Sequence, residues 1–321
     1  MNLYLISNGE TIDITEIVTS VTLKGDYRSC CRTLDFGIIS AQTDENTRTV
    51  YTQAGDTIKL VENGETMFHG IIFSRNISSD GKTIDFECKD YGIYLKKNSG
   101  FYKFKGMTPE SITRKICADY GIATGSIATA GKGINRVFMG VTLYDIIMTA
   151  YSMSNDKKYM VLFKGKNLNI IEKGVEECFL LESKGNLLTA TASESLDDMV
   201  NRVTIYNKKN AVVKRLENAS DIAAYGLMSS YVKASDTKKD YRQEAKKKLK
   251  GIERKVTVTN FGDVSYMTGK TVMVKENYTG IIGKFYIDGD EHNWKNGIYT
   301  NKLTLNYENI MDEKESGSEK E

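Results

Sequence analysis

A nine-residue pattern that occurs twice constrains the fold of this chain more than any other feature. Residues 55–63 read GDTIKLVEN and residues 269–277 read GKTVMVKEN, so both share the first glycine, a threonine, alternating aliphatic residues and a final Glu-Asn. Apolar residues at every second position are typical of a strand with one buried face. One such match could arise by chance in a strand-rich chain, so the surrounding sequence must decide between coincidence and duplication.

The same plan continues after both copies. A second strand with an internal glycine follows, at 67–73 in the first copy and at 281–287 in the second, and a third strand then comes at 83–88 and at 298–307. Glycine within a strand marks a bulge, a bend or a close backbone approach. The shared order predicts an internal duplication of a β-domain. A single binding cleft does not need two copies of one domain, whereas a ring of repeated domains does.

Composition excludes several classes of function. The 321 residues are enough for two or three domains, and the net charge of +2 provides no overall field for nucleic acid or an anionic membrane. No run approaches 18 apolar residues and the first nine residues lack a secretory signal, so we expect cytosolic synthesis and no membrane anchor. The cysteines are odd in number and form no C-x-x-C pair, so we expect core residues without disulfides or zinc: Cys30, Cys31, Cys88, Cys117 and Cys178.

The order of the expected elements predicts a mainly β chain of α+β character. Residues 1–100 contain six or seven short strands separated by turns, as in a sandwich or barrel. Residues 101–190 contain two helices and a hairpin, which predicts a small α+β domain. Residues 191–310 return to strands and form the second β-domain. The acidic residues 311–321 are expected to be a disordered tail.

Helix signals define the segments between the strands. Thr108 caps a helix that begins with proline and ends at Gly121, and Thr142 begins a second helix. We expect the glycine-rich stretch between these helices, up to Gly140, to be an exposed loop. The polar stretch 207–232 also favours a surface loop, and 236–250 predicts an amphipathic helix.

Chemical motifs are few. Gly-Lys-Thr occurs at 81–83 and 269–271, but both lack the upstream glycine of a phosphate-binding loop and both open a strand instead of a helix. His69 and His292 lie on strands or turns, and no nucleophile near either suggests a catalytic pair. We therefore expect no enzyme, no catalytic residues, no cofactor and no metal site.

One acidic cluster supports an alternative function. Asp288, Asp290 and Glu291 precede His292, and paired carboxylates can perform acid–base chemistry on a glycosidic bond. The alternative is thus a glycosidase acting on cell-wall glycan. Asp-Gly-Asp is also a common turn sequence, and that local interpretation is favoured here. A monomeric carbohydrate-binding protein is a third possibility.

The stretch 233–255 is strongly basic, with ten Lys and Arg against four acidic residues. Such a run is usually the solvated face of an amphipathic helix. Because no stacking aromatics are interleaved with the lysines, we expect no specific nucleic-acid binding. A docking surface for another protein stays open as an alternative.

Several stretches together resemble the baseplate hub proteins of contractile phage tails and defective-prophage particles, the XkdQ/YqbQ type, and more distantly the late-control-D hub proteins. These stretches are 14–35 with the following Gly55-Asp56 and 68–72, then 108–122, 199–203 and 283–292. None contains a catalytic signature. The resemblance therefore rests on order and spacing over most of residues 1–310.

The resemblance implies a structural protein and a homotrimer. In such hubs two tail-tube-like β-barrel domains flank a small α+β domain, so three subunits form a pseudo-sixfold ring that joins the tail tube to the central spike. The implied partners are the tail tube protein, the spike protein and other baseplate proteins. The implied location is the baseplate of a virion or of a bacteriocin-like particle, assembled in the cytoplasm of the bacterial host. We also expect 207–232 or 233–255 to contact a baseplate neighbour.

Overall fold

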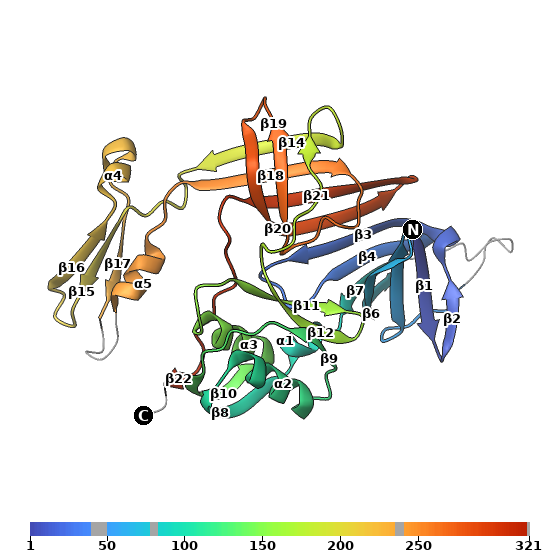
Figure 1. The fold of residues 1–321 in the computed structure, drawn as a ribbon, viewed down its shortest axis with the longest axis horizontal. Helices are drawn as coiled ribbons and strands as arrows, with labels where there is room; N and C mark the ends of the chain where they lie inside the picture. Colours follow the sequence, from blue (N-terminus) through green and yellow to red (C-terminus); the bar gives the residue numbers. More distant parts are fainter. Residues whose placement is uncertain (40–49, 78–82, 235–240, 320–321) are drawn as a thin grey trace. The chain divides into compact units, whose positions relative to one another are not determined.

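The computed structural model describes residues 1–39, 50–77, 83–234 and 241–319, and strands dominate it (Figure 1). The expected mainly β fold class is confirmed. The chain groups into two compact units, one formed by Met1–Ala190 with Thr257–Glu321 and the other by Thr191–Val256. The predicted division of the chain at residues 100, 190 and 310 is a different partition and stays a prediction.

Five antiparallel strands form the first meander, in the spatial order β3-β4-β7-β6-β5, and β1 and β2 extend it beyond β5. Alternating apolar side chains fill its core, among them Leu23, Leu34, Phe36, Ile58, Leu60, Phe68 and Phe86. The strands are β1 (Asn2–Ser7), β2 (Glu10–Asp13), β3 (Val18–Asp26), β4 (Thr33–Ile39), β5 (Thr57–Glu62), β6 (Glu65–Ile77) and β7 (Thr83–Asp90).

The second meander repeats this order strand for strand as β14-β18-β21-β20-β19. Its strands are β14 (Leu187–Ser195), β18 (Glu253–Phe261), β19 (Thr271–Glu276), β20 (Ile281–Lys295) and β21 (Ile298–Asn306). The short strand β13 (Leu181–Glu182) pairs in parallel with β19. The internal duplication predicted from the repeated pattern is therefore confirmed.

The first glycine of the pattern has the same role in both copies. Gly55 has a φ of +96° and Gly269 a φ of +94°, values that suit a residue without a Cβ atom. The N–H of Gly55 donates to the carbonyl of Ile72, and the N–H of Gly269 donates to the carbonyl of Ile287, both at 2.9 Å. Each glycine thus ties the start of one strand to the middle of the next.

A bulge follows at the matching place in both copies. The β6–β7 register shifts between Ile72 and Ser74, and the β20–β21 register shifts between Ile287 and Gly289. A bulge inserts one extra residue and bends the strand. These shared bulges make Ile72 equivalent to Ile287 and Ser74 equivalent to Gly289.

The long strand β20 joins the two meanders. One of its edges pairs with β21, while the other pairs first with β19 along 281–286 and then with β3 along 289–295. Figure 1 shows β3, in blue, beside β20, in red. The result is one 13-stranded sheet whose path runs from β14 to β2. The expected tail-tube-like barrels are not found as closed barrels within the described ranges, because β20 continues into the other meander instead of returning to its own.

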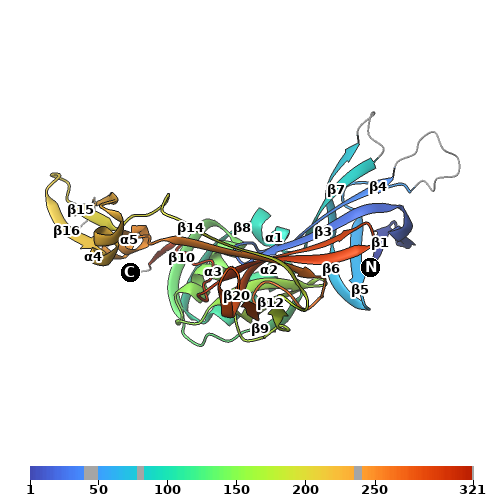
Figure 2. The same cartoon turned by 90° about the horizontal axis from the view of Figure 1, so that it is seen from above.

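The region after β7 forms an α+β layer with its own core. Helices α2 and α3 pack against each other near β10 (Figure 2), and the Thr142 hydroxyl caps α3 by accepting the N–H of Asp145 at 3.1 Å. Both predicted helices and the predicted hairpin are confirmed. The elements are α1 (Ile93–Lys97), β8 (Ser99–Met107), α2 (Pro109–Asp119), β9 (Thr124–Ile127), β10 (Ile134–Thr142), α3 (Leu143–Ser152), β11 (Tyr159–Lys164) and β12 (Asn167–Glu172).

The prediction of an exposed loop between the two helices is wrong. Strand β9 pairs in parallel with β12, and β10 pairs with β8. Ile127, Ile134 and Phe138 are buried in the core of this layer. Burial of these side chains outweighs the loop preference of the glycines around them.

The described residues of the unit Thr191–Val256 form a three-stranded sheet and two helices. The surface loop expected over 207–232 is wrong, because most of this stretch forms strands and a helix. The first part of the helix predicted at 236–250 lies outside the described residues. The elements are β15 (Arg202–Tyr206), β16 (Val212–Glu217), α4 (Ala219–Tyr225), β17 (Ser229–Lys233) and α5 (Tyr241–Lys248).

The acidic segment expected to be a disordered tail makes specific contacts over residues 311–319. Met311 is buried in the core of the α+β layer, and Asp312 accepts a hydrogen bond from the Tyr144 hydroxyl at 2.9 Å. Strand β22 (Ser318–Glu319) pairs with β10. One buried methionine and paired backbone groups thus order a stretch whose composition favours disorder. Within the described ranges, no helix has both the length and the apolar character needed to cross a bilayer.

Candidate functional site at the joint between the meanders

The pairing of β20 with β3, called the joint below, is where the two copies of the duplicated fold meet. Seven consecutive residue pairs form it, from Gly289 opposite Asp26 to Lys295 opposite Ser20. The far end of β20 enters the core of the first meander, where the Trp294 indole N–H donates to Glu62 at 2.8 Å. The joint is therefore both a strand pairing and a packed interface.

Asp290 is the centre of the joint and is fully buried. The guanidinium of Arg32, which precedes β4, donates to both carboxylate oxygens of Asp290, with one contact at 3.0 Å. Thr268 donates its N–H at 2.7 Å and its hydroxyl at 2.5 Å to Oδ1 of the same carboxylate. A bidentate arginine–carboxylate pair fixes geometry as well as charge. This pair ties the first meander to the second.

His292 extends this network. Its imidazole is completely buried, and Nε2 lies 3.1 Å from Oδ2 of Asp290. The other ring nitrogen lies 2.7 Å from the Tyr299 hydroxyl and 2.8 Å from the side-chain amide of Asn301. Burial alone would raise the pKa of Asp290, but the charge of Arg32 and the interaction with His292 outweigh it and hold that pKa well below its usual range.

Gly25 makes room for the ion pair. It lies opposite Asp290 in the β3–β20 pairing. A Cβ atom at Gly25 would stand 2.8 Å from Oδ1 of Asp290 and closer still to the guanidinium of Arg32. The absence of a side chain is therefore a requirement of this site.

A second buried ion pair connects β20 to the α+β layer. The ammonium of Lys173, which follows β12, lies 2.9 Å from Asp288 and donates to the carbonyl of Ile310 at 2.6 Å. The other oxygen of Asp288 accepts from Asn306 at 2.9 Å. Burial lowers the pKa of Lys173, although the charge of Asp288 opposes that shift.

The acidic cluster singled out in the sequence therefore has structural partners. The turn expected at 288–290 is wrong, because all three residues lie inside β20 and Gly289 follows the bulge. Asp288 and Asp290 each face a different cation, and Glu291 accepts from the Asn293 amide at 2.9 Å. A glycosidase needs two carboxyl groups facing one cleft. This geometry does not favour the glycosidase alternative.

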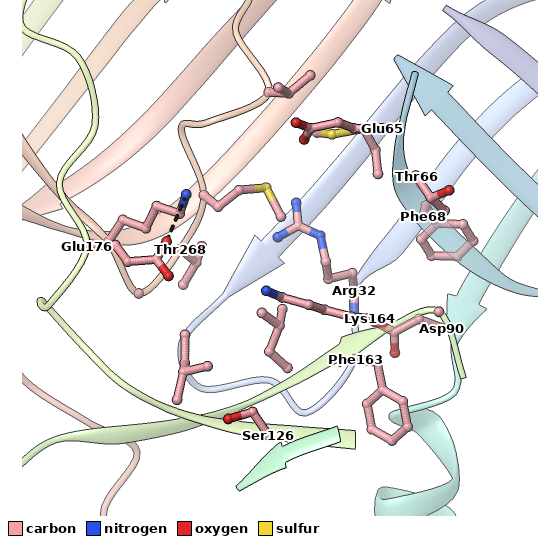
Figure 3. A pocket seen from close by; sticks show the side chains of 18 of the residues that line it. Arg32, Glu65, Thr66, Phe68, Asp90, Ser126, Phe163, Lys164, Glu176 and Thr268 are labelled. Carbon is pink, nitrogen blue, oxygen red and sulfur yellow. Dashed lines mark hydrogen bonds and ion pairs between the residues drawn. The ribbon is translucent and has the colours of Figure 1, made fainter. Parts of the chain in front are cut away.

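A cavity of about 800 Å³ opens beside the joint, lined by parts of β6, the β11–β12 hairpin and the loop before β19 (Figure 3). Its lining mixes both signs of charge, and Glu176 and Lys270 pair across 3.1 Å. Burial raises the pKa of Asp90 to about 7, while its oxygens accept the backbone N–H groups of Arg32 and Gly92. Among the described residues, no cluster of three or more His, Cys, Asp or Glu could hold a metal ion.

Of the sequence-predicted residues, the structure brings Asp290 and His292 together and leaves His69 apart from them. The half-buried His69 ring packs edge-on against Tyr91, at 5.5 Å between ring centroids. The residues that complete the joint, Arg32 and Thr268, were missed from the sequence.

The profile of the YqbQ-like proteins matches residues 21–306. The chain belongs to the YqbQ-like family. This confirms the resemblance seen in the sequence. The chain is 26% identical over 327 residues to the phage-like element PBSX protein XkdQ of Bacillus subtilis (strain 168), and the match covers 98% of this chain and 99% of that protein.

Solved structures share the fold of this YqbQ-like protein. The 43 kDa tail protein of prophage MuSo2 from Shewanella oneidensis superimposes with a TM-score of 0.72 at 13% identity, covering 95% of this chain and 97% of the tail protein. The E. coli c3393 protein superimposes with a TM-score of 0.55 at 9% identity, covering 94% of this chain and 76% of that one. The latter is described as a component of the type VI secretion system with structural similarity to the T4 bacteriophage tail proteins gp27 and gp5.

Proposed function

We propose that this YqbQ-like protein is a structural hub of a phage-like tail baseplate and works as a homotrimer. The observation that carries the proposal is the duplicated meander, with the same strand order, the same glycine conformation and the same bulge in both copies. Three chains would supply six equivalent meanders, so a threefold assembly could face a sixfold tube. Heterologous contacts between repeated surfaces generate closed rings when the rotation closes.

The known relatives support a role in a tail. XkdQ is a protein of a phage-like element, the MuSo2 protein is a prophage tail protein, and c3393 is likened to gp27 and gp5. On this proposal one side of the ring binds the tail tube protein, the other side binds the central spike protein, and no chemical step is required of the chain. The two predicted barrel domains would then be completed by neighbouring subunits, and we retain them as part of the proposal.

The small unit Thr191–Val256 is the proposed contact with a baseplate neighbour. Its helix α5 ends in three consecutive exposed lysines, 246–248. Replacing Lys246 by Glu should weaken binding to an acidic partner, measured as loss of co-purification from assembled particles, and Lys184→Glu is a control outside this unit. Equal co-purification of both variants would contradict this contact.

Light scattering on a sizing column tests the trimer directly. A species near three times 36.0 kDa is expected, either alone or after addition of the spike protein from the same particle. A chain that stays monomeric with both the tube and the spike protein present would overturn the proposed function.

A further inference from the structure

The two meanders differ in what pairs with them beyond the bulge. From the shared bulges, residues Ser74–Ile77 of β6 are equivalent to residues Gly289–His292 of β20. In β20 this stretch pairs with β21 on one edge and with β3 on the other. In β6 it pairs with β7 on one edge, while β5 ends its pairing at Ile71. Over the described part of the chain, no strand occupies the other edge of β6 at 74–77.

Side-chain exposure agrees with an uncovered edge. Phe73 is 42% exposed and Ile77 is 47% exposed, whereas Asp288 and His292, at the equivalent positions in β20, are buried. Large apolar side chains exposed along a strand edge mark a place for pairing with another chain. The free edge therefore lies at the position that the joint covers in the second meander.

The strand that would fit this edge is the equivalent of β3. In the strand order, β3 lies between β4 and β20, whereas its counterpart β14 has only β18 beside it among the described strands. The sequence of β14, LLTATASES, contains neither lysine nor proline, and most of its residues are exposed. Lysine and proline are the usual protection of an edge strand against pairing. Among the described residues, each chain thus has one open β6 edge and one open β14 edge.

We propose that β14 of a second copy of this chain pairs with β6 at Ser74–Ile77, as β3 pairs with β20 inside the chain. The proposal rests on the proposed trimer and assigns its interface. The contact is heterologous, because one copy gives β6 and the next gives β14. This contact is the counterpart, between two chains, of the joint within one chain. Around a ring of three chains, β20–β3 pairings within chains would therefore alternate with β6–β14 pairings between chains.

The register of this contact follows from equivalent positions. Asn76 is equivalent to Glu291, which pairs with Lys24 in the joint. In the first meander Lys24 pairs with Thr33 of β4, and β18 is the equivalent of β4. The residue of β14 equivalent to Lys24 therefore follows from the contacts between β14 and β18. In these, the Phe261 N–H donates to the Asn186 carbonyl at 3.0 Å and Arg254 pairs with Glu194 at 2.8 Å. By this equivalence we expect residues 191–193 of the neighbouring copy to lie opposite Asn76.

Cysteine cross-linking tests the pairing. Asn76→Cys is made in one preparation, and Thr191→Cys, Ala192→Cys and Ser193→Cys are made in three others. Each β14 variant is mixed with the Asn76→Cys protein and treated with a short thiol cross-linker. Covalent dimers are expected for at least one of the three β14 positions, at least tenfold above the background from each variant alone, which also controls for the native cysteines.

A matched control uses the joint itself. The double variant Lys24→Cys/Glu291→Cys should cross-link within one chain, without a change of mass, and it reports that the fold is intact. A trimer by light scattering and a closed control, with no cross-link at any of the three positions, would overturn this pairing while leaving the proposed function in place. A chain that stays monomeric with the tube and spike proteins present would overturn both.

Discussion

The first and second meanders have the same strand order, but they differ in the type and burial of the side chains at equivalent positions past the bulge. In the second, Asp290 and His292 are buried beside Arg32, while their equivalents in the first, Arg75 and Ile77, lie at an exposed strand end. The comparison shows that alternating apolar residues, one glycine and one bulge are enough to give both meanders the same strand order. The side chains past the bulge then depend on whether another strand already lies beside them.

Among the variants that test this comparison, Asp290→Asn is expected to lose the most stability. It leaves the Arg32 guanidinium buried without its carboxylate, so we expect a loss of about 3–5 kcal/mol in the free energy of unfolding. Urea denaturation measures it. The matched variant at the equivalent position, Arg75→Asn, removes only a hydrogen bond from an exposed guanidinium to the carbonyl of Thr52 and should cost about 1 kcal/mol. Equal losses would show that the two positions do not differ as described.

Gly25→Ala should have the next largest effect. Its new methyl group would press against the Arg32–Asp290 pair, and overpacking of this kind costs about 1–3 kcal/mol. Thermal or urea unfolding gives the value. Ala211→Gly, at an exposed position before β16, is the control, and a cost of less than about 1 kcal/mol is expected there. A neutral Gly25→Ala variant would mean that the ion pair has more room than the structure indicates.

The pH dependence of stability should separate the wild type from Asp290→Asn. The folded pKa of Asp290 lies below its ordinary value of 3.8, so its contribution is present above that pH and is lost as the pH falls below it. The unfolded chain then binds a proton that the folded chain does not, which costs up to about 1.4 kcal/mol per pH unit. Urea midpoints between pH 5 and pH 3 should fall less steeply for Asp290→Asn. If the urea midpoints of the wild type and of Asp290→Asn fell equally with pH, the pKa of Asp290 would not be lowered in the folded protein.

The smallest effect is expected for Glu291→Gln, which leaves both buried ion pairs of β20 intact. Stability should change by no more than about 0.5 kcal/mol, and the mass in solution should stay the same. Any turbidity loss that the protein causes in a cell-wall suspension should also be unchanged. A lytic activity present in the wild type and absent from this variant would revive the glycosidase alternative.

Local patterns were sufficient to predict the duplication and the two central helices. The first glycine of each repeat, Gly55 and Gly269, and the capping Thr142 have the conformations that their neighbours suggest. The loop expected up to Gly140 failed because tertiary burial of Phe138 overrides the preference of nearby glycines. Strand β16 was missed because its residues are almost all exposed and show no apolar alternation.

The joint could not be predicted from the sequence. Arg32 and Asp290 are 258 residues apart, and no local pattern links them. Around Asp290, the Asp-Gly-Asp sequence favours a turn when judged alone. Pairing with β3 and β21 stabilises an extended strand there instead, which is tertiary information that nearby residues do not contain.

The length of β20 has a consequence for how a ring would assemble. Because β20 extends past its own meander to pair with β3, that contact forms when the chain folds and does not depend on protein concentration. Six separate meanders would lose translational and rotational freedom at every contact, whereas three chains lose it only at the contacts between them. In the proposed ring, covalent linkage makes three of the six contacts intramolecular and allows a complete ring at a lower protein concentration.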